Sequence, residues 1–169
     1  MFMAVQLQFA ALLAFAALML LAAFEDLRRL VIPNVLTLSL CVLWPLYALG
    51  TPTLFVTLGS LACALLAFLV GALLFSRGYI GGGDVKLLAV AVLWAGPGKA
   101  VPLLLVTGVL GGMLALFLLI PPAAHLAMLA RAKLGPSDAS IKSDLATPVP
   151  YGVAIAAAAI IVIFVPHFR

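Results

Sequence analysis

The stretch LFVTLGSLACALLAFLVGALLF, residues 54–75, is an apolar run that contains no charged side chain. A helix of about 20 such residues is long enough to cross the ~30 Å hydrocarbon core of a bilayer. The whole chain has the same character, since 67% of its 169 residues are hydrophobic and only 8% are charged. Soluble domains carry about 25% charged residues. The composition therefore predicts an integral membrane protein surrounded by the lipid bilayer.

Further apolar runs lie on both sides of this segment, separated by glycine and proline clusters that end helices. Together they predict an all-α, polytopic membrane protein with about six transmembrane helices. A single integral-membrane domain is expected over residues 1–169, since the length leaves no room for a separate soluble domain. The first run lacks a basic N-terminal region and is expected to be a retained helix rather than a signal peptide. The expected helices are residues 5–24, 33–49, 54–75, 85–95, 101–120 and 149–164.

Basic residues indicate the side of the membrane that each loop faces, because Lys and Arg collect in cytoplasmic loops. Most of them fall in the first, third and fifth loops, so these loops are expected to be cytoplasmic and both termini to face outward. The charges are scattered between apolar runs and form no stripe for nucleic acid, which is not expected as a partner. The residues on the cytoplasmic side are Arg28, Arg29, Arg77, Lys86, Arg131, Lys133 and Lys142, and those on the outer side are Lys99 and Arg169.

The chain has five acidic residues, and their surroundings differ. Asp138 and Asp144 lie in a polar loop, where solvated surface charges are expected. Glu25, Asp26 and Asp84 instead adjoin apolar spans, where ionisable groups are costly and generally functional. The expected topology brings the last two of these to the same, cytoplasmic side.

Asp26 and Asp84 are therefore a candidate catalytic pair, although spacing alone does not decide between Asp26 and the adjacent Glu25. Two neighbouring carboxyl groups cannot both ionise easily and so share a proton. One of them then takes a proton from water while the other donates one to a scissile carbonyl, which suits peptide hydrolysis. The alternative on the residues alone is that Asp26 pairs with Arg28 or Arg29 at the membrane surface, or caps a helix.

The fourth expected helix, residues 85–95, is only about 16 Å long at 1.5 Å per residue, roughly half of a hydrocarbon core. Either its inner end at Asp84 is recessed below the headgroups, with irregular backbone before it, or the helix begins earlier, near Tyr79. The glycines at 81–83 allow close backbone approach, so a substrate strand has room beside Asp84.

Three motifs resemble those of a known family and occur in the same order. GGGDVKL at residues 81–87 resembles the GxGDxK signature of the type IV prepilin peptidases, which are GxGD-type membrane aspartic proteases. DLRRLVIPN at residues 26–34 resembles the D-x-R-x-x-x-I-P-N segment around that family's first aspartate, and PYG at residues 150–152 resembles the motif that opens its last helix. The resemblance covers essentially the whole chain. The arginines after Asp26 fit the prepilin branch better than the presenilin branch.

The resemblance implies an aspartic endopeptidase of the bacterial inner membrane that needs no cofactor. Its substrates would be type IV prepilins and pseudopilins, cleaved at the cytoplasmic face after a short basic leader. The chain lacks the cytoplasmic domain with paired CxxC motifs found in longer members and resembles the short form of Flp, or tight-adherence, pili, so methyltransferase activity is not expected. The catalytic residues implied are Asp26 and Asp84. The residues implied to bind substrate or support the site are Gly81, Gly83, Lys86, Arg28, Pro33 and Asn34.

Other functions stay open on the residues alone. A non-enzymatic transporter, or an assembly scaffold for pili or secretion, would use Asp84 and Lys86 as an ion-coupling or structural pair. The chain has one interrupted region and no matching second half, which disfavours transport. A presenilin-type protease would cut within the bilayer, whereas these aspartates adjoin cytoplasmic helix ends. No metal site is expected, since His125 and His167 lack clustered ligand partners, and homo-oligomer formation is left open.

Overall fold

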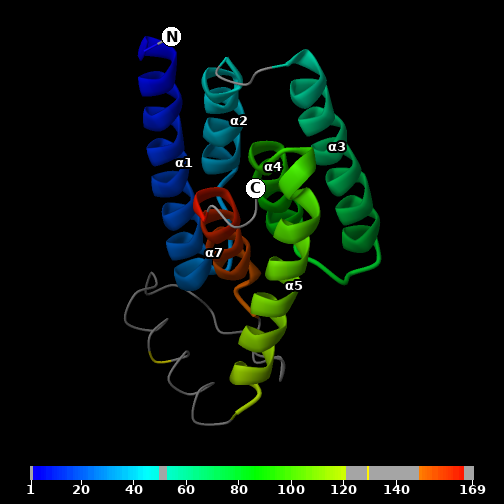
Figure 1. The fold of residues 1–169 in the computed structure, drawn as a ribbon. Helices are drawn as coiled ribbons and strands as arrows, with labels where there is room; N and C mark the ends of the chain where they lie inside the picture. Colours follow the sequence, from blue (N-terminus) through cyan, green and yellow to red (C-terminus); the bar gives the residue numbers. More distant parts are fainter. Residues whose placement is uncertain (1, 50–52, 121–128, 130–148, 166–169) are drawn as a thin grey trace.

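The computed structural model describes residues 2–49, 53–120, 129 and 149–165. This part of the chain consists of helices without strands, which confirms the all-α prediction (Figure 1). The apolar runs form the helices, and the glycine and proline clusters between them separate one helix from the next. The helices are α1 (Phe2–Arg29), α2 (Asn34–Ala48), α3 (Leu54–Ser76), α4 (Gly82–Ala95), α5 (Pro97–Leu118) and α7 (Tyr151–Phe164).

Helix α1 extends past its expected end at residue 24 and places Asp26 inside its last turn. It ends where Leu30 adopts a left-handed conformation with φ 54°. The N–H of Leu30 donates a hydrogen bond of 2.9 Å to the carbonyl oxygen of Asp26, so the last turn is closed. The short link that follows then turns the chain into α2.

Helix α4 begins at Gly82, three residues before the expected start, so Gly82 and Gly83 are helical. Of the two alternatives open from the sequence, the structure agrees with an earlier helix start, although the helix begins at Gly82 and not near Tyr79, and the backbone directly before Asp84 is helical. The residue before the helix, Gly81, is extended with φ −68° and ψ 141°. Its carbonyl oxygen accepts a hydrogen bond of 3.1 Å from the N–H of Val85, which closes the first turn around Asp84.

Three helices are long and apolar enough to cross a membrane, namely Gln6–Arg29, Leu54–Ser76 and Pro97–Leu118. Helices α2 and α7 are apolar but shorter. Large apolar side chains cover the outside of the bundle, for example Phe55 with 84% of its surface exposed, which is the pattern expected for contact with lipid. Six crossings and outward termini stay predictions. The basic residues expected in the fifth loop and at the C-terminus lie outside the described residues.

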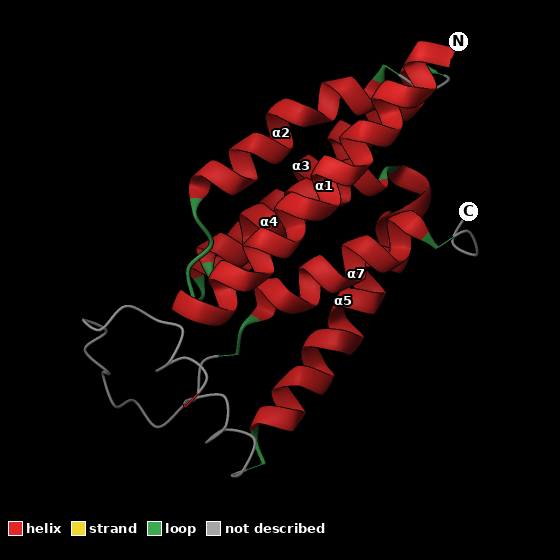
Figure 2. Ribbon diagram, turned by 90° about the vertical axis from the view of Figure 1, so that its left-hand side faces the viewer, coloured by secondary structure: helices red, strands yellow, loops and turns green. Residues whose placement is uncertain are grey.

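Helix α4 lies within the bundle and packs against α2, α3, α5 and α7, while α1 packs against α2 and α7 (Figures 1 and 2). Near the far end of α4, Trp94 is 1% exposed and its ring lies 4.6 Å from that of Phe15 in α1. Its indole N–H donates a hydrogen bond of 3.1 Å to the carbonyl oxygen of Leu40 in α2. This core holds α4 in place against α1 and α2.

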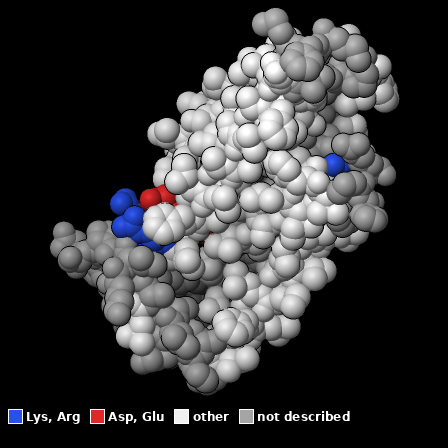
Figure 3. All heavy atoms as spheres, turned by 60° about the vertical axis from the view of Figure 1, so that its left-hand side comes forward, with Lys and Arg blue, Asp and Glu red and all other residues white. Residues whose placement is uncertain are grey.

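Four segments meet at one end of the bundle: the last turn of α1, the link before α2, the first turn of α4 and the start of α7 (Figure 1). In the space-filling view, Lys and Arg atoms gather beside acidic atoms at one edge of the visible face, and another basic group lies far from them (Figure 3). Most of the remaining described surface in that view is uncharged. The end of the bundle where the segments meet holds the candidate site.

Candidate active site

Asp26 is buried, with 5% of its surface exposed. A buried carboxylate requires hydrogen-bond donors or a positive charge nearby. One donor is the backbone N–H of Gly152 in the first turn of α7, which lies 2.7 Å from Oδ2 of Asp26. Asp26 therefore caps a helix, which was one of the alternatives open from the sequence, and the helix that it caps begins far along the chain.

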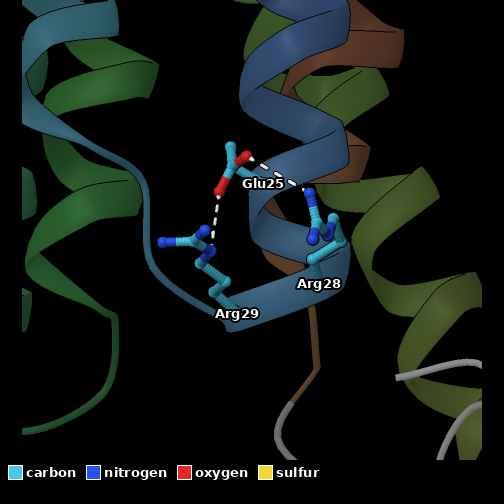
Figure 4. A network of polar contacts seen from close by, with 3 residues as sticks. All are labelled: Glu25, Arg28 and Arg29. Carbon is cyan, nitrogen blue, oxygen red and sulfur yellow. Dashed lines mark ion pairs between the residues drawn. The ribbon is translucent and has the colours of Figure 1, made fainter. Parts of the chain in front are cut away.

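The adjacent Glu25 has different partners. Its Oε2 lies 3.2 Å from Nε of Arg29, and its Oε1 lies 3.9 Å from Nη1 of Arg28 (Figure 4). Residues three and four apart share a face of a helix, so these contacts are local to α1. The side chains are partly exposed, and such pairs contribute little to stability. Of the two adjacent acidic residues, Glu25 thus lies with the arginines and Asp26 is enclosed by the bundle.

Asp84 lies in the first turn of α4 and is half-buried. Burial raises the pKa of its carboxyl group to about 6, and the negative charge of Asp26 acts in the same direction, whereas a hydrogen bond from the backbone of Gly81 opposes the shift. A Cβ atom on Gly81 would lie 2.8 Å from Oδ2 of Asp84, closer than real Cβ contacts. Glycine at this position therefore lets the backbone approach the carboxyl group.

Both aspartates line one pocket of about 220 Å³. Its walls come from the end of α1 with the link that follows, from the start of α2 and from the first turn of α4. Polar and charged groups therefore gather in a hollow at the end of an otherwise apolar bundle. The lining residues are Asp26, Leu30, Val31, Ile32, Asn34, Gly81, Gly82, Gly83, Asp84 and Lys86.

Most of the site residues predicted from the sequence lie in this lining; Arg28 and Pro33 are not part of it. Arg28 contacts Glu25 on the outside of α1. Pro33 is the residue before the first turn of α2, in an extended conformation, and so orients Asn34. Nζ of Lys86 donates a hydrogen bond of 3.0 Å to Oδ1 of Asn34, which joins α4 to α2 at the pocket.

Gly152 has no assigned role in the sequence-based prediction, although its backbone contacts a predicted catalytic residue. The PYG motif at residues 150–152 was the available signal. A motif of this kind indicates that a short segment has a constrained backbone conformation or contact, but it does not indicate which distant side chain the segment contacts.

In the described part of the chain, no three His, Cys, Asp or Glu side chains lie close enough together to hold a metal ion. The groups that the pocket offers for chemistry are two carboxyl groups and the ammonium of Lys86. Two carboxyl groups with different surroundings are suited to general acid–base catalysis, since one can hold a proton while the other is ionised.

A family model described as "Type IV leader peptidase family" matches residues 13–116. The matched segment contains α2, α3 and α4 entirely, together with both aspartates and all the lining residues of the pocket. Searches of curated proteins and of solved structures gave no significant match.

Proposed function

The chain belongs to the type IV leader peptidase family, and from this premise we propose that it is a membrane aspartic endopeptidase with Asp26 and Asp84 as its catalytic pair. The proposed substrates are type IV prepilins and prepilin-like proteins. The proposed reaction is removal of their leader peptides at the cytoplasmic face of the bacterial inner membrane, without a cofactor.

The observation that carries the proposal is the shared pocket of Asp26 and Asp84. The two residues are 58 positions apart in sequence, yet their charges interact, since Asp26 contributes to the raised pKa of Asp84. The pocket is at the end of the bundle, where a peptide that enters from the aqueous side reaches it without crossing the apolar core. This position favours cleavage at the membrane interface over cleavage within the bilayer.

The mechanism that we propose uses one water molecule and one shared proton. Asp84, whose pKa is raised, donates its proton to the scissile carbonyl oxygen while Asp26 takes a proton from the attacking water. The water oxygen forms a bond to the carbonyl carbon and gives a tetrahedral gem-diol. The C–N bond then breaks, the leaving amine takes the proton from Asp26, and a hydroxyl proton of the gem-diol returns to Asp84.

The test is cleavage of a co-expressed prepilin by the wild type, Asp26→Asn and Asp84→Asn, with equal membrane levels verified. Asn has nearly the size of Asp but cannot take up or release the proton, so both variants are expected to leave the prepilin uncut. Asn also retains a side-chain oxygen that can accept the hydrogen bond from Gly152. Loss of activity in Asp26→Asn would therefore report on chemistry and not on the loss of a helix cap.

Glu25→Gln is the matched control, because Glu25 is the acidic neighbour that lies outside the pocket lining. It is expected to process the prepilin at close to the wild-type rate. If Asp26→Asn or Asp84→Asn accumulates normally and still processes it at that rate, the mutated aspartate is not catalytic. A scaffold or transporter function would then be favoured.

A further inference from the structure

The first turn of α7 has no cap from its own sequence. The residue before the helix is Pro150, and it makes no side-chain capping hydrogen bond. The N–H of the second helical residue, here Gly152, is one that an N-cap side chain usually binds. In this protein the acceptor is Oδ2 of Asp26, which belongs to α1.

The contact between Gly152 and Asp26 leaves no space for a side chain. A Cβ atom on Gly152 would lie 2.8 Å from Oδ2, 2.9 Å from Cγ and 3.0 Å from Cβ of Asp26. Real Cβ atoms almost never approach other atoms so closely, so any other residue would displace the carboxyl group or the start of α7. The hydrogen bond of 2.7 Å therefore depends on glycine at this position.

Helix α5 holds the start of α7 from the other side. The ring of Tyr151 lies against Gly111, where a Cβ atom would be 2.8 Å from Cε1 of the ring. Helix α7 also packs against α1 and α4. The amide of Gly152 is therefore presented to Asp26 from a packed helix and not from a free loop.

We propose that Gly152 is a positioning residue of the active site, whose backbone amide fixes the orientation of the Asp26 carboxyl group. Because one carboxylate oxygen is bound, rotation of the group is restricted, and so is the position of its other oxygen relative to Asp84. The inference rests on the proposed function. It adds α7, which lies outside the matched residues 13–116, to the helices α1 and α4 that carry the two aspartates.

Two changes at residue 152 distinguish the effect of losing the backbone N–H from the effect of adding a side chain. Replacement of Gly152 by glycolic acid during cell-free synthesis converts the amide to an ester, which deletes the N–H and adds no bulk. Gly152→Ala keeps the N–H and adds the methyl group that meets Asp26. Both are expected to lower kcat for cleavage of a purified prepilin by about tenfold or more, with KM within about twofold, because substrate binding does not use this contact.

Two matched controls show the effect of an ester bond, and of an added methyl group, at positions that do not contact Asp26. The amide of Val153 donates to the carbonyl oxygen of Pro150 at 3.2 Å and not to Asp26, so the corresponding ester at Val153 is expected to leave kcat within about twofold of the wild type. Gly112→Ala adds a methyl group to a helix where nothing lies within 4 Å, and it is likewise expected to be near wild type. Thermal unfolding is measured for every variant.

A kcat for the Gly152 ester equal to that of the Val153 ester would overturn the inference, and so would a loss that only follows reduced thermal stability. If Gly152→Ala does not accumulate, the Gly152 ester alone tests the positioning role, since it adds no side chain. Asp26→Asn distinguishes this inference from the proposed function. An inactive Asp26→Asn with a fully active Gly152 ester refutes the positioning role alone, whereas an active Asp26→Asn refutes the catalytic pair itself.

Discussion

Lys86 donates a hydrogen bond of 3.0 Å from Nζ to Oδ1 of Asn34, a residue 52 positions earlier in the chain. Asn34 belongs to the segment that follows the first aspartate, and Lys86 lies two residues after the second. The bond therefore joins the two motifs at the pocket that they share, and it holds a positive charge at the rim.

This contact predicts that Lys86 and Asn34 act together. Lys86→Met removes the charge at the pocket and is expected to lower kcat/KM for prepilin cleavage by about tenfold. Asn34→Ala keeps the charge of Lys86 but removes the hydrogen bond that holds it in place, so the effect on kcat/KM is expected to be smaller. The double variant is expected to be no worse than Lys86→Met alone, because both changes remove one interaction. Strictly multiplicative effects in this double-mutant cycle would contradict the coupling.

The pKa of Asp84 predicts the pH dependence of cleavage. Because burial and the charge of Asp26 raise this pKa to about 6, Asp84 is protonated below that pH and ionised above it. The proposed mechanism needs the proton, so kcat/KM, which reports the free enzyme, is expected to fall above about pH 6 by up to about tenfold per pH unit. Initial rates in detergent between about pH 5 and about pH 8 measure this. A kcat/KM that rises steadily over that range would exclude Asp84 as the proton donor.

The same shift predicts how Asp84 affects stability. In the folded protein its pKa is above the ordinary value of 3.8, so the folded state binds more protons than the unfolded state between 3.8 and about 6. The free energy of unfolding therefore falls as pH rises through this window, and at higher pH the ionised Asp84 destabilises the fold. Asp84→Asn carries no charge and is expected to unfold at a higher temperature than the wild type at about pH 8, with the difference lost near about pH 4. Equal melting temperatures at the higher pH would contradict this.

The helices were predictable from the sequence because hydropathy reports directly which segments are apolar. The ends of the helices were harder to predict, since hydropathy reports polarity and not backbone conformation. The polar residues Glu25 and Arg29 seemed to follow the first helix, yet they continue it and form an ion pair across one turn. Gly82 and Gly83 were compatible either with irregular backbone or with an earlier start of the helix, and both are helical, since glycine permits a helix without favouring it.

The candidate site was predictable in part. The order of the motifs and the expected topology brought Asp26 and Asp84 to one side, and both line one pocket. The contact between Asp26 and Gly152 was not predictable in the same way. It depends on how α7 packs between α1 and α5, and no periodicity within a single helix encodes that packing. A sequence motif identified the segment around Gly152 but not the side chain that it binds.

Trp94 allows a test of the core that is separate from the site. Its ring packs against Phe15, and its indole N–H donates to the carbonyl oxygen of Leu40, so Trp94→Phe removes this hydrogen bond and leaves a cavity. The free energy of unfolding is expected to fall by about 1–3 kcal/mol, measured by chemical or thermal unfolding in detergent. Phe55→Leu, at a residue that is 84% exposed, is the control and is expected to be nearly neutral. Because Trp94 lies about 15 Å along α4 from Asp84, the folded fraction of Trp94→Phe is expected to cleave prepilin at the wild-type rate. A strong loss of kcat without loss of stability would instead mean that packing around Trp94 affects the geometry of the site.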